Sequence, residues 1–160
     1  MSEFKFPTEE IDLPSKGLLY PKDSPLASGT IEMKYMTAKE EDILTNPNYL
    51  AKGIVIDKLL QALIISKVNY SDLVIGDQNA IMIAARILGY GKDYEFNYGG
   101  FSQKVDLTTL EDKEFDETLI TPHTNEFTFT LPHSKIELTF KVLTVGDGVK
   151  MRKELEGLKK

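Results

Sequence analysis

The chain has 160 residues, a formal net charge of −6 and no cysteine, and 41% of its residues are hydrophobic. Its length allows one domain with a hydrophobic core, and its acidic balance argues against broad binding to nucleic-acid phosphates or anionic membranes. Without cysteine, disulfides, thiolate chemistry and the commonest structural zinc sites are excluded.

No targeting or membrane-spanning segment is predicted. The start, Met1-Ser2-Glu3, is acidic and lacks the basic and apolar regions of a secretory signal. The longest apolar run, residues 54–65, is interrupted by polar residues and is too short to cross a bilayer. These features predict a soluble protein of the cytoplasm.

Residues 1–29 contain prolines at positions 7, 14, 21 and 25. Each proline fixes its own φ and favours an extended conformation in the residue before it, so this segment is predicted to be an extended arm. The arm has too many apolar side chains for an unattached linker. Composition favours packing on its own domain, and docking on a partner is the alternative. The side chains predicted to bind a partner are Leu13, Leu18, Leu19 and Tyr20.

Residues 30–107 are predicted to form a helical core with a flanking strand and a first hairpin. Apolar and polar residues alternate over residues 30–36, which is the period of a half-buried strand. Thr37 is followed three residues later by Glu40, the spacing of a capping box, so a helix is expected to begin there. Pro47 should end this helix, because proline cannot continue the hydrogen-bond ladder.

The spacing of apolar residues predicts two further helices. For the last of them, Asp77 is a candidate cap, and Gly89 or Gly91 is expected to stop the helix. Arg86 stands alone on this apolar helix, where it is interpreted as a snorkelling or ion-paired residue, or as an anchor for a partner. The apolar stripe of the preceding helix is formed by Ile56, Leu59, Leu60, Leu63 and Ile64.

A first β-hairpin is predicted after the helices. Residues 94–98 and 101–107 alternate in character, and Gly99-Gly100 between them provides a tight turn. Residues 108–125 follow as an acidic, irregular connection on the surface.

Residues 126–160 are predicted to contain a second hairpin and a C-terminal helix. The hairpin strands are residues 127–131 and 136–140, and Thr144 and Asp147 can start the helix. The whole chain is therefore predicted to have an α+β fold, with a small helical centre, two β-hairpins and an extended proline-rich N-terminal arm.

No catalytic, cofactor-binding or metal-binding site is predicted. His123 and His133 lie in loop and turn sequence, and no spacing brings them to shared carboxylates. Gly89-Tyr90-Gly91 follows a helix and not a strand, which is the wrong context for a dinucleotide-binding loop. No serine has the context of a nucleophile elbow.

Three segments carry a resemblance to a known family. They are residues 13–21 (LPSKGLLYP), residues 36–44 (MTAKEEDIL), and residues 76–81 (GDQNAI) leading to residues 85–91 (ARILGYG). In this order and spacing they resemble the baseplate hub and hub-assembly proteins of T4-type contractile-tailed bacteriophages.

The resemblance covers residues 11–107 well and is weaker over residues 127–143. It implies a non-enzymatic tail protein that binds other tail or baseplate proteins, with the arm adding strands to neighbours or filling their grooves. Relatives of this type often carry a Cys-x-x-Cys-like turn after the Gly-Tyr-Gly stretch. Here residues 97–101 read NYGGF, so the hairpin is expected without a metal.

The leading hypothesis is a baseplate hub component or a hub-assembly factor. Its binding residues are the four apolar arm residues, exposed apolar positions on the central helices, and Arg86. We expect tail proteins as partners, without nucleic acid or membrane, in the cytoplasm of the infected bacterial host or in the virion baseplate. The oligomeric state is left open. The alternatives are a general peptide- or protein-binding adaptor unrelated to virions, and an enzyme that uses scattered carboxylates.

Overall fold

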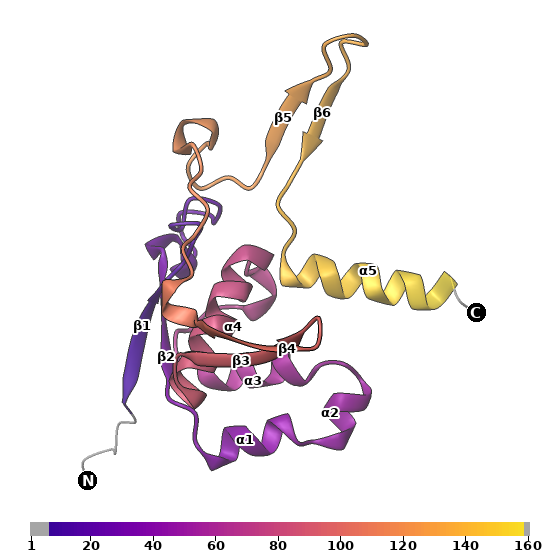
Figure 1. Ribbon diagram of the computed structural model, residues 1–160. Coiled ribbons are helices and arrows are strands. Elements are labelled where there is room, and N and C mark those ends of the chain that lie inside the picture. The colour runs from indigo at the N-terminus through magenta and orange to yellow at the C-terminus, as the bar shows by residue number, and fades with distance from the viewer. Residues whose placement is uncertain (1–6, 159–160) are drawn as a thin grey trace. The chain divides into compact units, whose positions relative to one another are not determined.

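The computed structural model describes residues 7–158 and has an α+β fold, as predicted (Figure 1). Its strands pair into three separate two-stranded antiparallel sheets, β1 with β2, β3 with β4, and β5 with β6. The strands are β1 (Thr8–Asp12), β2 (Thr30–Lys34), β3 (Asp93–Tyr98), β4 (Phe101–Asp106), β5 (Phe127–Thr130) and β6 (Glu137–Phe140). The α-helices within residues 7–158 are α1 (Ala38–Leu44), α2 (Pro47–Ala51), α3 (Val55–Leu63), α4 (Ile75–Tyr90) and α5 (Val145–Leu158).

The chain divides into two compact units, each built from segments that are distant in sequence. The first unit contains the described residues up to Ile11 together with residues 31–66 and 79–114. The second contains residues 12–30, 67–78 and those from Phe115 onward. The N-terminal arm and helix α4 therefore each contribute residues to both units.

The core of the first unit is built from β2, α3 and α4. Met33 of β2 is fully buried and forms an isolated bridge with Ile64, the residue that follows α3. Ile56, at the start of the predicted apolar stripe, remains exposed. The buried apolar residues of this unit are Ile31, Met33, Leu59, Leu60, Leu63, Ile81 and Ala85.

Helix α1 begins with the predicted capping box. The backbone N–H and the hydroxyl of Thr37 both donate to Glu40, and Lys34 Nζ lies 2.8 Å from Glu40 Oε1. Burial by itself raises the pKa of Glu40, but the hydrogen bonds from Lys34 and Thr37 lower it to about 2. A buried, paired carboxylate thus fixes the junction between β2 and α1.

Pro47 follows the end of α1, as predicted, and it also opens α2. The side-chain oxygen of Asn46 accepts hydrogen bonds from the backbone N–H of Asn48 (3.0 Å) and of Tyr49 (3.2 Å), which caps the new helix. Proline is tolerated here because its missing N–H would have no partner in the first turn. The sequence prediction contains no α2, since five residues are too few to show an apolar period.

In the second unit, Asp77 joins the arm to α4. Helix α4 begins at Ile75, so Asp77 lies inside the first turn and its prediction as the helix cap is wrong. Its carboxylate accepts hydrogen bonds from the N–H (2.9 Å) and hydroxyl (2.6 Å) of Ser15 and from the phenol of Tyr20 (2.6 Å). The oxygen of Tyr20 in turn accepts from the Val74 N–H at 3.1 Å. These partners satisfy a carboxylate that is only 1% exposed.

After β1 the arm turns back on itself. A turn lies at residues 15–17, with Lys16 and Gly17 at φ of +51° and +76°. A Cβ atom at Gly17 would lie 2.5 Å from the carbonyl oxygen of Ala27, so the close approach of these two segments requires glycine. Over residues 7–29 the arm is therefore a strand followed by a compact turn, and residues 1–6 of the predicted arm lie outside the described residues.

The start of α5 also agrees with the prediction. Asp147 Oδ2 accepts hydrogen bonds from the N–H (3.1 Å) and hydroxyl (2.9 Å) of Thr144, and the Asp147 N–H donates back to that hydroxyl at 3.2 Å. Val145, the first helical residue, is buried. This reciprocal capping anchors the helix at its N-terminal end.

Candidate partner-binding surfaces

The β3–β4 hairpin has one aromatic face. Residues paired across an antiparallel ribbon point to the same side, and successive residues alternate between sides. Tyr98 and Phe101, next to the turn, are 77% and 72% exposed, and Gly99 and Gly100 both have positive φ, as a tight turn between such strands requires. The register places on one face Tyr94, Phe96, Tyr98, Phe101, Gln103 and Val105.

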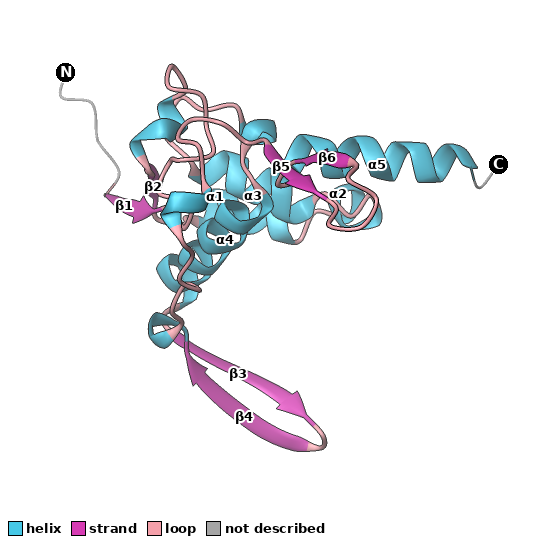
Figure 2. Cartoon of the chain, turned by 90° about the horizontal axis from the view of Figure 1, so that it is seen from above, coloured by secondary structure: helices cyan, strands magenta, loops and turns pink. Residues whose placement is uncertain are grey.

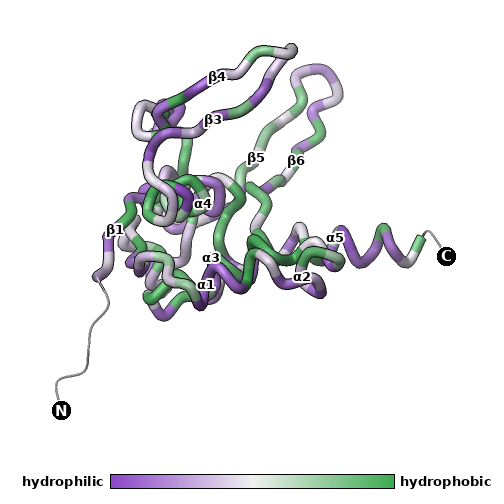
Figure 3. Tube along the Cα trace, turned by 60° about the horizontal axis from the view of Figure 1, so that its bottom comes forward, coloured by the Kyte–Doolittle hydropathy of each residue, from purple (hydrophilic) through white to green (hydrophobic). Residues whose placement is uncertain are grey.

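The opposite face of this hairpin is charged. Lys104 Nζ lies 2.9 Å from Asp93 Oδ2, and Lys92 Nζ lies 2.7 Å from Asp106 Oδ2. Figure 2 shows the two strands of this ribbon side by side. The ribbon is consequently amphipathic, and its alternation of hydrophobic and hydrophilic residues can be followed along both strands in Figure 3.

The β5–β6 hairpin repeats this design in the second unit. Phe127 pairs with Phe140 and their rings stack with centroids 5.6 Å apart. The pair Phe129 and Leu138 follows on the same face, where both side chains are exposed. The other face carries Thr128, Thr130, Glu137 and Thr139.

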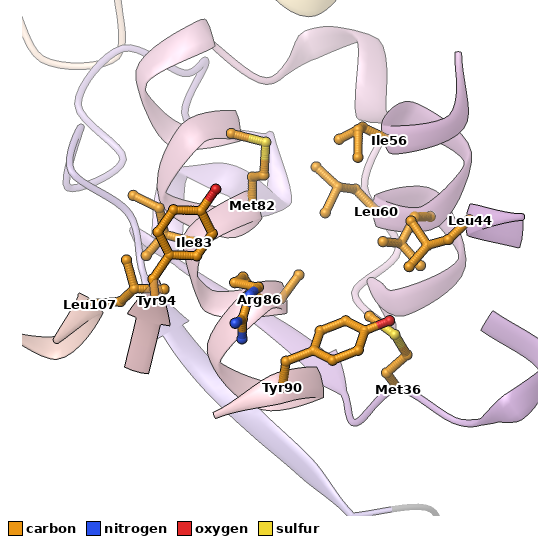
Figure 4. A pocket seen from close by; sticks show the side chains of 12 residues that line it. Met36, Leu44, Ile56, Leu60, Met82, Ile83, Arg86, Tyr90, Tyr94 and Leu107 are labelled. Carbon is orange, nitrogen blue, oxygen red and sulfur yellow. The ribbon is translucent and has the colours of Figure 1, made fainter. Parts of the chain in front are cut away.

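A third apolar surface is a groove in the first unit, formed by α1, α3, α4 and the start of the β3–β4 hairpin. Its cavity volume is about 430 Å³. Leu59, Leu60 and Ala85 are its buried lining residues, while Ile56 and Met82 are exposed. Figure 4 shows the side chains of its 12 lining residues, most of them labelled. The complete lining is Met36, Leu44, Ile56, Leu59, Leu60, Met82, Ile83, Ala85, Arg86, Tyr90, Tyr94 and Leu107.

Among the described residues that line the groove, Arg86 alone is charged. Its guanidinium lies 5.1 Å from the ring centroid of Tyr90 and 5.6 Å from that of Tyr94, between the two rings (Figure 4). It donates hydrogen bonds to the carbonyl oxygens of Gly91 (2.9 Å) and Asp93 (3.3 Å). Within residues 7–158, no carboxylate forms an ion pair with it.

The four arm residues predicted to bind a partner lie in the second unit, whereas Arg86 lies in the first. Leu13, Leu19 and Tyr20 are buried in the second unit, and Leu18 is half-buried. Burial raises the pKa of the Tyr20 phenol, and its hydrogen bond to Asp77 raises it further. The arm thus packs on its own chain, which is the first of the two alternatives. Its role in partner binding stays a prediction.

The sequence prediction did not single out the hairpin faces as binding surfaces. The signal was present, because aromatic and apolar residues recur at every second position in both hairpins. That pattern is equally typical of a strand covered by its own domain. Only the structure distinguishes a covered face from an exposed one.

A cluster of hydrogen-bonded polar side chains is buried in the second unit. Ser15, Tyr20 and Asp77 form this cluster, and their polar atoms bond to one another and to the backbone. Between residues 7 and 158 no three histidine or acidic side chains are placed to hold a metal ion. None of the helices in that range has the length and apolarity needed to span a membrane.

Comparison with known proteins found no match among protein-family models, curated sequences or solved structures. Residues 7–158 thus define an α+β protein in which two hairpin faces and one helical groove expose apolar side chains.

Proposed function

We propose that this chain is a non-enzymatic protein of a contractile bacteriophage tail, either a baseplate hub component or a hub-assembly factor, and that it acts by binding other tail proteins. One observation carries the binding role: each of two hairpins exposes a face that is almost entirely apolar. An isolated two-stranded hairpin is marginally stable in water, and large exposed apolar patches mark interaction sites.

The assignment to a phage tail is supported by the three sequence segments that resemble hub proteins. Two of these segments meet in the fold, where Ser15 and Tyr20 of the first bond to Asp77 of the third. Thr37 and Glu40 of the second segment form the capping box of α1. Since these residues hold the fold together, the resemblance favours a shared framework over a shared catalytic site.

The test is copurification of tagged protein after co-expression with the tail proteins of its source phage. We expect hub or baseplate subunits to be recovered with the unaltered chain. Phe129→Thr combined with Leu138→Thr should reduce the recovery, because threonine keeps the strand but removes the apolar face. Thr128→Ser with Thr139→Ser alters the opposite face and serves as the matched control. Recovery of no tail protein with the unaltered chain contradicts the proposal.

Mass spectrometry of finished particles separates the two roles. A baseplate component is retained in the virion, whereas an assembly factor acts in the host cytoplasm and is missing from purified particles.

The second candidate is a general peptide-binding adaptor. Within residues 7–158 the two strands of each hairpin pair only with one another, so every strand also has an outer edge where an extended peptide can add. Binding of short extended peptides, without any tail-protein partner, favours this candidate.

A further inference from the structure

We propose that the groove of the first unit binds an amphipathic helix of a tail protein, and that a carboxylate on this helix pairs with Arg86. The inference rests on the proposed function. It specifies the partner segment as an amphipathic helix with a carboxylate and assigns its recognition to Arg86.

The open rim of the groove favours a macromolecule over a small ligand. Tyr90 and Tyr94, like Ile56 and Met82, line the groove and still have large exposed fractions, from 39% for Ile56 to 50% for Tyr90. Sites for small molecules enclose most of the ligand surface, and their apolar walls are therefore largely covered. Here the apolar walls face solvent and need a partner with a surface of its own.

The construction of the groove favours a helix. Its walls come mainly from the helices α3 and α4, and an amphipathic helix laid into such a groove buries side chains spaced by three and four residues. Met36 and Met82 both line it, and methionine side chains adapt their shape to the residue that packs on them.

The charge of Arg86 requires a carboxylate on the partner helix. A guanidinium has five N–H donors, and the hydrogen bonds to Gly91 and Asp93 use two of them. A helix covering the groove would remove water from this charge, and burying an unpaired charge is costly. A carboxylate next to the apolar anchors removes that cost and accepts the remaining N–H groups.

Site-specific photo-crosslinking locates the partner. A photoreactive amino acid replaces Met82, at the groove, in the full chain co-expressed with the tail proteins. The matched control replaces Leu50 on α2, which is 53% exposed and lies outside the groove lining. We expect the Met82 variant, and not the Leu50 variant, to crosslink to one tail-protein segment with apolar residues at helical spacing and an aspartate or glutamate beside them.

A double-mutant cycle then tests the ion pair. The crosslinked segment is synthesised with its acidic residue and with the corresponding amide, and both peptides are titrated against the unaltered chain and Arg86→Gln. We expect the amide to bind the unaltered chain about fivefold more weakly, as for a partly exposed ion pair. Arg86→Gln should bind the two peptides equally. Lys52→Gln, an exposed charge change outside the groove, should behave like the unaltered chain.

The outcomes separate this inference from the proposed function. If tail proteins copurify but Met82 gives no crosslink, the groove assignment is wrong and the proposed function stands. If no tail protein copurifies, the proposed function itself fails. The inference is overturned if Met82 crosslinks to a second copy of this chain or to a segment without a carboxylate. It is also overturned if the groove binds a small fatty acid, with decanoate as the probe, more tightly than it binds the peptide.

Discussion

The phenol of Tyr20 donates a hydrogen bond of 2.6 Å to the carboxylate of Asp77, across 57 positions of sequence. The same carboxylate accepts two hydrogen bonds from Ser15. One buried side chain therefore holds both ends of the arm's turn against the first turn of α4. The binding surfaces depend on the fold that such internal contacts maintain.

We expect Asp77→Ala to lower the free energy of unfolding by about 3 kcal/mol, because it leaves buried donors of Ser15 and Tyr20 without their acceptor. Urea denaturation followed by circular dichroism measures this change. Asp23→Ala removes an exposed carboxylate of the same unit and should change stability by less than about 0.5 kcal/mol. Equal effects of the two substitutions would show that the cluster is not important for stability.

Glu40 should make stability depend on pH in the acid range. Its pKa in the folded chain is about 2, below the usual value of 4.5. The ionised carboxylate therefore stabilises the fold above pH 4.5, and this contribution is lost as the pH falls toward 2. We expect Glu40→Gln to cost about 2 kcal/mol at pH 7 and clearly less at pH 3. Glu41→Gln, at the exposed neighbouring position, is the control, and an unchanged difference at both pH values contradicts the prediction.

Gly17 and Gly157 should respond in opposite directions to the same substitution. Gly17→Ala places a Cβ 2.5 Å from a carbonyl oxygen at a positive φ, so we expect a loss of about 2 kcal/mol or more. Gly157 lies in α5 with no atom within 4 Å of an added Cβ, and alanine there should be neutral or stabilising by up to about 1 kcal/mol. Thermal unfolding of both variants provides the comparison. A similar midpoint for both disproves the close approach of the arm segments.

The N-terminal capping of α5 can be tested with Thr144. Thr144→Ala removes the hydroxyl that bonds with Asp147, and we expect a loss of about 1 kcal/mol together with reduced helical content. Thr144→Ser keeps the hydroxyl and should retain most of the stability. Backbone NMR shifts over residues 145–158 measure the helix directly, and unchanged shifts in Thr144→Ala would exclude a capping role.

Local features of the fold could be predicted because their partners are close in sequence. Glu40 lies three residues from Thr37, and Gly99-Gly100 joins two alternating strands directly. In both cases the interacting residues lie within one short stretch of sequence. The capping box and both hairpins were therefore predictable from residue type and spacing alone.

Long-range features could not be predicted in this way. Asp77 fits the pattern of a helix cap, but its actual partners are Ser15 and Tyr20, which no local rule connects with it. Arg86 was identified as a lone charge on an apolar helix, whereas its position between two tyrosine rings depends on where β3 follows α4. The exposed state of the hairpin faces depends on the whole fold and not on their alternation.

The interleaving of the two units has a consequence for synthesis on the ribosome. The first unit needs residues up to Glu114, and the second needs segments that begin at Asp12 and continue beyond Phe115. Residues 12–30 therefore emerge early and wait for Asp77, which is translated with residues 67–78, and the rest of their unit follows only from Phe115 onward. The apolar side chains of the arm, Leu13 and Tyr20 among them, are open to chaperones during that interval.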